Sequence, residues 1–114
     1  MALNFVSRET KGVTILDLSG KIVLGRESQA LRERVKQLLE EGKKKILLNL
    51  ADITFIDSSG VGALVSAFTS ARSQGGDLKL ANLTEKFQET LMVTRLLTVF
   101  DVYDNEAEAI SHFL

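Results

Sequence analysis

From residue 27 onward the sequence alternates between helix and strand patterns, and this alternation constrains the fold more than any other feature of the chain. Apolar residues recur at helical spacing over residues 27–41 and again over residues 61–71. Between them, KILLNL (residues 45–50) is a nearly continuous apolar run, which is typical of a strand covered on both faces. Strands that alternate with helices form βαβ units, so the sequence predicts a largely parallel sheet.

The two ends of the chain complete this pattern. Two β-rich runs, NFVSRE and VTILDLSG, are separated by Lys11-Gly12 and predict a hairpin that adds an antiparallel edge. After the second helix we expect a strand at LKLA, a helix from residue 84 to about 95, a short strand at VFDVY, and a final helix to Leu114. The expected fold is a single α/β domain over residues 1–114, with a mixed, mostly parallel sheet of four to five strands flanked by about four helices.

Composition limits the classes of function. The net charge of −1 and the pI of about 5.8 leave no basic stripe for a sequence-independent grip on nucleic acid. The chain has no cysteine, which excludes disulfides, thiolate catalysis and cysteine-based zinc sites. The longest uncharged stretch, residues 58–71, is too short and too rich in Ser, Thr and Gly to span a bilayer. We therefore expect a soluble cytoplasmic protein without membrane insertion.

The segment FIDSSGVG (residues 55–62) lies where the buried strand leads into the second helix, and functional sites collect at such points. Asp57, Ser58 and Ser59 are residue types preferred as helix N-caps. Gly60 and Gly62 weaken the helix start that a cap would stabilise, because glycine costs a helix about 1 kcal/mol relative to alanine. The glycines either let the helix pack closely on the sheet or keep the surface low, so that a partner's active site reaches Ser58. We favour the second hypothesis, which predicts that Gly60→Val still folds but binds a partner less tightly.

Other kinds of site match these residues poorly. Gly60-x-Gly62 is only a fragment of a phosphate-binding loop, and no lysine follows it. A serine hydrolase needs G-x-S-x-G and a positioned histidine, whereas the chain's single histidine is His112, on a predicted surface helix. A receiver-like domain phosphorylated on Asp57 would have the right size, but Asp17-Leu18 does not supply the acidic pair that holds magnesium in such domains.

The segment LNLADITFIDSSGVGALV resembles the signature segment of STAS domains, specifically the bacterial anti-sigma factor antagonists. The similarity extends over nearly the whole chain, from the initial hairpin to the last strand. The resemblance implies a regulatory switch that is not an enzyme and needs no cofactor. It implies that a partner which is both serine kinase and anti-sigma factor phosphorylates Ser58, with Ser59 as the second choice. The unphosphorylated form binds that partner and releases a sigma factor, and a serine phosphatase restores it.

The expected partner surface combines the turn with a loop that precedes the first helix. Its predicted members are Asp57, Ser59, Gly60, Val61, Leu24, Gly25 and Arg26. After Gly20, many relatives carry acidic residues where this chain has Lys21 and Val23. That difference leaves the partner class open, so an adaptor that is never phosphorylated, as in a lipid transport complex, remains the main alternative.

Overall fold

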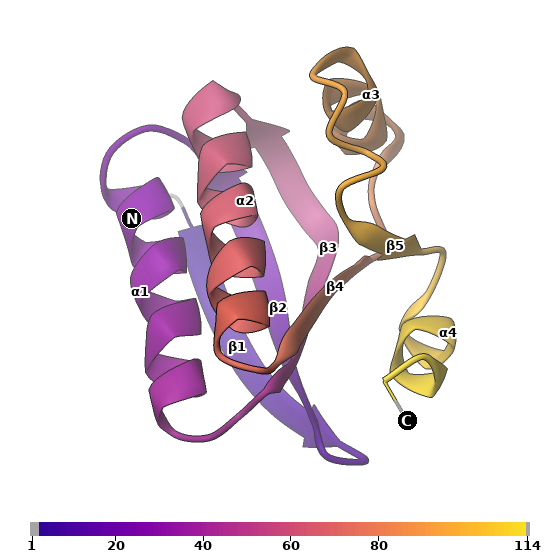
Figure 1. Ribbon diagram of the computed structural model, residues 1–114. Helices are drawn as coiled ribbons and strands as arrows, with labels where there is room; N and C mark the ends of the chain where they lie inside the picture. Colours follow the sequence, from indigo (N-terminus) through magenta and orange to yellow (C-terminus); the bar gives the residue numbers. More distant parts are fainter. Residues whose placement is uncertain (1–2, 114) are drawn as a thin grey trace.

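The computed structural model describes residues 3–113, which form one five-stranded sheet in the order β1-β2-β3-β4-β5 (Figure 1). The strands are β1 (Leu3–Thr10), β2 (Val13–Ile22), β3 (Lys45–Ile56), β4 (Asp77–Ala81) and β5 (Asp101–Tyr103). The helices in the described range are α1 (Arg26–Glu40), α2 (Ser58–Ser73), α3 (Glu85–Val93) and α4 (Glu106–Ser111). Only the β1–β2 pair is antiparallel among these strands, so the predicted mixed, mostly parallel sheet is confirmed.

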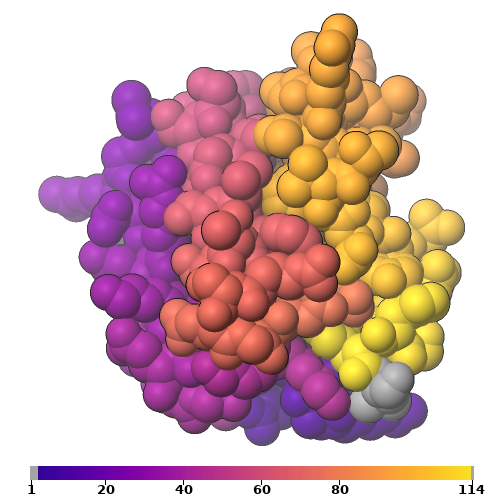
Figure 2. Space-filling model, viewed as in Figure 1, coloured from indigo at the N-terminus to yellow at the C-terminus, as the bar shows by residue number. Residues whose placement is uncertain are grey.

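The sheet is covered on both faces, because alternate residues of its central strands enter two different apolar clusters. Leu16 and Leu18 of β2 belong to the main core, which also contains the buried faces of α1, α2 and α3. Val13 and Ile15 point to the other face and pack with Ala109 and Ile110 of α4. In Figure 1, α1 and α2 lie side by side in front of the sheet, and the space-filling view shows α2 exposed between α1 and the C-terminal third of the chain (Figure 2).

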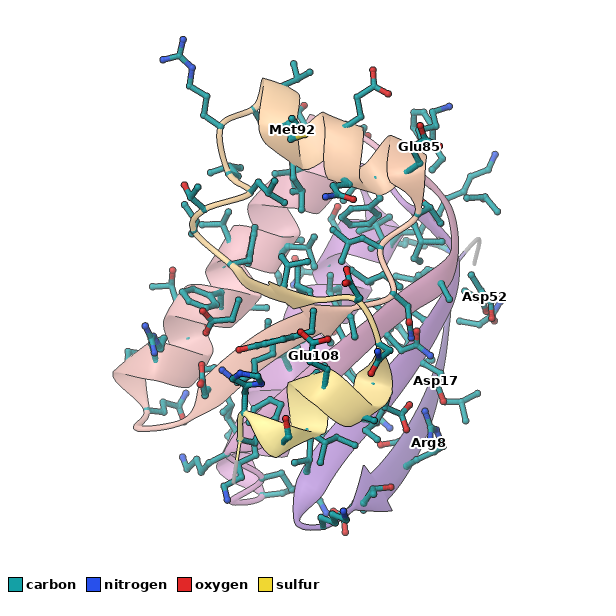
Figure 3. The ribbon with its side chains drawn as sticks, turned by 90° about the vertical axis from the view of Figure 1, so that its right-hand side faces the viewer. Arg8, Asp17, Asp52, Glu85, Met92 and Glu108 are labelled. Carbon is teal, nitrogen blue, oxygen red and sulfur yellow. The ribbon has the colours of Figure 1, made fainter. Side chains whose placement is uncertain are left out.

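Polar side chains tie α4 to the hairpin on this second face. The Arg8 guanidinium donates to both carboxylate oxygens of Asp17, at 2.6 and 2.9 Å, and to Oε1 of Glu106 at 2.6 Å. Figure 3 shows Arg8 and Asp17 next to each other on the neighbouring strands β1 and β2. Hydrogen bonds from Arg8 and from Asn49 hold the pKa of the Asp17 carboxyl below its usual range, although partial burial opposes this.

Most predicted elements are confirmed within a few residues, and the largest difference concerns β3. The strand continues six residues past the predicted end at Leu50 and stays paired with β2 as far as Ile56, opposite Ile22. Its pairing with β4 ends earlier, at Asn49 and Ala81. The second half of β3 therefore extends past β4, paired in parallel with β2, and this extension carries the turn of interest.

The C-terminal helix is confirmed in part. The side chain of Asn105 accepts a hydrogen bond from the N–H of Glu108 at 2.8 Å and so caps the start of the helix. The helix ends at Ser111, and Leu114, the predicted end, lies outside the described residues. Across residues 3–113 the helices are each too short or too polar to cross a bilayer.

Candidate functional site

A single carboxylate organises the turn between β3 and α2. Asp57 is the N-cap of α2, and its Oδ1 accepts a hydrogen bond from the N–H of Gly60 at 2.8 Å. Its second oxygen, Oδ2, accepts from the N–H of Leu24 at 3.0 Å, in the loop that joins β2 to α1. Asp57 therefore performs the capping role that its residue type indicates and also links two segments that are far apart in the sequence.

These two hydrogen bonds from backbone N–H groups also stabilise the negatively charged form of Asp57. The N–H groups of Leu24 and then Gly60 hold the pKa of the Asp57 carboxyl below its usual range, because both donors favour the charged form. The N-terminal end of α2 acts in the same direction, since a helix dipole favours negative charge there. Asp57 is consequently a carboxylate at neutral pH.

The loop bonded to Asp57 has a second fixed point. The backbone N–H and the hydroxyl of Ser28 both donate to the carbonyl of Val23, at 3.1 and 2.7 Å. Gly25 then turns the chain into α1 with a φ of +100°, a backbone conformation that side chains other than glycine's rarely adopt. Between these points the side chain of Leu24 stands 75% exposed. The loop is thus held through its backbone, while the apolar side chain of Leu24 faces solvent.

The two candidate phosphoacceptors differ in accessibility. Ser58 is the first residue of α2 and is exposed, whereas Ser59 is half-buried. Arg26 and Gly25 are exposed on the neighbouring loop. The structure therefore brings Ser58, Asp57 and the loop from Leu24 to Arg26 close together, through the hydrogen bond between Leu24 and Asp57.

The hypothesis that Gly60 keeps the surface around Ser58 low, so that a partner's active site can reach the serine, is wrong. Gly60 is buried, and a Cβ added to it would lie 2.1 Å from the carbonyl oxygen of Ile22 and 2.7 Å from Cγ1 of Ile56. The absence of a side chain lets the first turn of α2 approach the ends of β2 and β3. Gly62 is different, because a Cβ there would meet only Nη2 of Arg32, at 3.8 Å.

Two members of the predicted partner surface do not lie on the surface. Val61 is only 3% exposed and belongs to the main core, and Gly60 is buried beneath the turn. Both residues follow the exposed Ser58 in the sequence, but the helical turn carries them round to the face that packs on the sheet. The accessible part of the predicted surface is reduced to Asp57, Ser59 and the loop from Leu24 to Arg26.

Phe55 is an exposed residue of this region that was not predicted from the sequence. Phe55 is 43% exposed, and Nζ of Lys86 lies 5.7 Å from the centre of its ring. The pairing of β3 with β2 passes from Ile53 to Phe55 and skips Thr54, which is the irregularity that exposes the ring. A signal was present in the sequence: Ile53 and Ile56, both buried, are three residues apart, which a regular strand of period two cannot place on one face.

Comparison with known proteins identifies the family. The family model for the STAS domain matches residues 4–109. The chain belongs to the STAS domain family. The anti-sigma-B factor antagonist of Bacillus subtilis is 29% identical over 102 residues, which cover 90% of this chain and 92% of that protein.

Solved structures share this STAS fold. The crystal structure of a Thermotoga maritima protein assigned to the anti-sigma factor antagonists has a TM-score of 0.84 and 27% identity, over 96% of this chain and 93% of that chain. The anti-sigma factor antagonist SpoIIAA of Bacillus, in its unphosphorylated form, has a TM-score of 0.72 and 20% identity, over 96% of both chains. SpoIIAA has also been solved in a phosphorylated form, with a TM-score of 0.70.

Proposed function

We propose that this STAS domain is a phosphorylation-controlled protein-binding switch and not an enzyme. In its unphosphorylated form it binds an anti-sigma factor that is also a serine kinase, and so frees a sigma factor in the cytoplasm. Phosphorylation of Ser58 ends the binding, and a serine phosphatase restores it. The kinase supplies the ATP, so the domain itself needs no cofactor.

The observation that carries the proposal is the exposed hydroxyl of Ser58 at the start of α2, directly after the capping Asp57. A hydroxyl in this position is open to the active site of a kinase. The names of the relatives, which are anti-sigma factor antagonists, support the nature of the partner. SpoIIAA, which shares the fold, has been solved with and without its phosphate, so in that protein the fold tolerates the modification.

Electrostatics explains how a phosphate would act at this position. A phosphate adds about −1.5 to −2 charges at neutral pH. The start of α2 favours this charge, whereas the neighbouring Asp57 carboxylate opposes it, so the effects on folding partly cancel. The exposed surface becomes strongly negative, and a partner that presents a carboxylate or an apolar patch to Ser58 is repelled.

Two alternatives keep a specific observation in their favour. This chain has the exposed Lys21, and Val23 two residues later, where many antagonists carry acidic residues. The lack of acidic side chains at these two positions favours an adaptor that is never phosphorylated. Asp57 lies at the end of a strand, as the phosphorylated aspartate of a receiver domain does, but both of its carboxylate oxygens already accept backbone hydrogen bonds. Phosphoserine survives acid and an aspartyl phosphate does not, so acid treatment of the phosphoprotein separates these two.

The proposal is tested with the partner kinase, isolated on the immobilised protein from the native cell and then purified. Wild type, Ser58→Ala and Ser59→Ala are incubated with this kinase and ATP, and phosphate is located by mass spectrometry. We expect wild type and Ser59→Ala to be phosphorylated on residue 58 and Ser58→Ala to remain unmodified. If Ser58→Ala is modified and Ser59→Ala is not, the phosphoacceptor is Ser59.

Binding to the same kinase shows the effect of a negative charge at position 58. Ser58→Ala should bind it about as tightly as wild type, because Asp57 still caps α2. Ser58→Asp adds one charge where phosphate adds nearly two, so calorimetry should show binding weakened by part of a coupling energy on the order of 1–3 kcal/mol. Undiminished binding by Ser58→Asp would favour the unphosphorylated adaptor.

A further inference from the structure

The Asp57 carboxylate holds two segments at once, and only one of them belongs to the helix. One oxygen caps α2 through Gly60, at 2.8 Å, and the other holds the backbone of Leu24, at 3.0 Å. A cap alone needs a single acceptor, and Asn105 caps α4 in that simpler way. The second oxygen is therefore available for a separate task, which is to fix the loop that carries Leu24.

Little else holds Leu24 in place. Its side chain is 75% exposed, so packing does not fix it. The Ser28 side chain and backbone secure the preceding Val23 carbonyl, and Gly25 follows with its φ of +100°. Glycine has the conformational freedom to allow a hinge at this point. The position of Leu24 consequently depends on its hydrogen bond to Asp57.

We propose that Asp57 is a positioning residue that couples the state of Ser58 to the position of Leu24. While Ser58 is unmodified, the carboxylate holds Leu24 outward as the apolar contact of the binding surface, which fits a partner with an apolar pocket. A phosphate on Ser58 weakens the bond to Leu24 and lets Leu24 move away from the turn, between the fixed Val23 carbonyl and Gly25. The inference rests on the proposed function, since it describes how that switch changes its binding surface.

The physical reason lies in the charge that a phosphate places beside the Asp57 carboxylate. That carboxylate accepts hydrogen bonds from the N–H groups of Gly60, at 2.8 Å, and of Leu24, at 3.0 Å. A phosphate on the adjacent Ser58 brings up to two negative charges and three strong acceptor oxygens to the same place. It repels the carboxylate and competes for its donors, and the exposed loop yields more easily than the helix, which is anchored in the core through Val61.

The experiment measures amide hydrogen exchange by NMR on the full chain, with phosphoserine installed at position 58 by semisynthesis. Installing the phosphate chemically makes the result independent of any kinase, so this inference can be refuted without refuting the proposed function, and the reverse. The variant Asp57→Asn removes one acceptor oxygen and keeps an equally good N-cap. Asp52→Asn, on the exposed part of β3, is the control for the loss of one carboxylate charge.

We expect the Leu24 amide to exchange about tenfold faster, or more, both with phosphoserine at position 58 and in Asp57→Asn. In Asp57→Asn the Gly60 amide should stay protected, which a general weakening of the helix start would not allow. Asp52→Asn should leave both amides unchanged. In the unmodified protein the Leu24 amide signal should also shift with pH as Asp57 titrates, and this shift should vanish in Asp57→Asn.

Either of two results overturns the inference. If Asp57→Asn leaves the exchange of Leu24 unchanged, Asp57 does not hold the loop. If Asp57→Asn accelerates exchange but phosphoserine at position 58 does not, the carboxylate positions Leu24 without coupling it to the phosphoacceptor.

Discussion

Replacing Gly60 with alanine is expected to destabilise the protein, because the first turn of α2 has no room for a side chain. The added Cβ would lie 2.1 Å from the carbonyl oxygen of Ile22, whereas carbon and oxygen normally meet at about 3.3 Å. The start of the helix would have to retreat by roughly 1 Å, against a second close contact with Ile56. Overpacking of this kind costs about 1–3 kcal/mol and occasionally more.

A gain in helix propensity opposes this cost. Alanine is better than glycine by about 1 kcal/mol inside a helix. Because the closest contact at Gly60 is with backbone, which cannot rotate away, we expect the cost at the upper end of its range, about 3 kcal/mol, and a net loss of about 2 kcal/mol. Gly60→Val adds a branched side chain at the same place, so the expectation from the sequence that this variant folds normally is revised.

Gly62→Ala is the matched control, two residues further along the same helix. Its added Cβ would meet only Arg32, at an ordinary 3.8 Å, so the variant should keep its propensity gain of up to about 1 kcal/mol. Urea unfolding followed by circular dichroism measures both variants, and their stabilities should differ by about 2–3 kcal/mol at an unchanged m-value. If Gly60→Ala is as stable as Gly62→Ala, the helix start is free to move, and close packing does not explain Gly60.

Two further predictions concern charges on the second face of the sheet. Lys79 has a buried side chain, and its ammonium group forms ion pairs with the partly exposed Asp77 and Asp101. Lys79→Ala should therefore lower the free energy of unfolding, measured by urea denaturation, by about 1–3 kcal/mol. An unchanged free energy of unfolding would show that these ion pairs contribute nothing to stability. Arg8 lowers the pKa of Asp17 in the folded protein. The charged Asp17 should therefore stabilise the fold fully above the ordinary aspartate pKa of about 3.9. This stabilisation should be lost as the pH falls through the lower pKa of Asp17 in the folded state. The stability difference between wild type and Asp17→Asn should therefore shrink on acidification, and a difference that stays constant from pH 7 to pH 2 would contradict this.

The order of elements could be predicted from the sequence because each follows a local rule. Lys11-Gly12 separates two β-rich runs and forms the hairpin turn, and Asn105 caps the last helix as its spacing to Glu108 indicates. Asp57 also capped its helix as its type predicts. These features depend on residues a few positions apart.

The features that the sequence did not predict depend on contacts between distant segments. Gly60 is required by the carbonyl of Ile22, which lies 38 positions earlier in the chain. Phe55 is exposed because the ladder between β2 and β3 skips a residue. The second bond of Asp57, to Leu24, joins a turn to a loop 33 positions away. No local pattern encodes the contacts of Gly60 and Asp57, so the sequence placed Leu24 near the site only through the family resemblance.

In the proposed switch, the charge state of Ser58 decides whether the partner binds. Isothermal titration calorimetry with the purified partner kinase, in the absence of ATP, compares the unmodified protein with the protein carrying phosphoserine at position 58. We expect the unmodified form to bind and the phosphorylated form to bind about 5- to 150-fold more weakly. Equal affinity of the two forms would contradict the proposed switch.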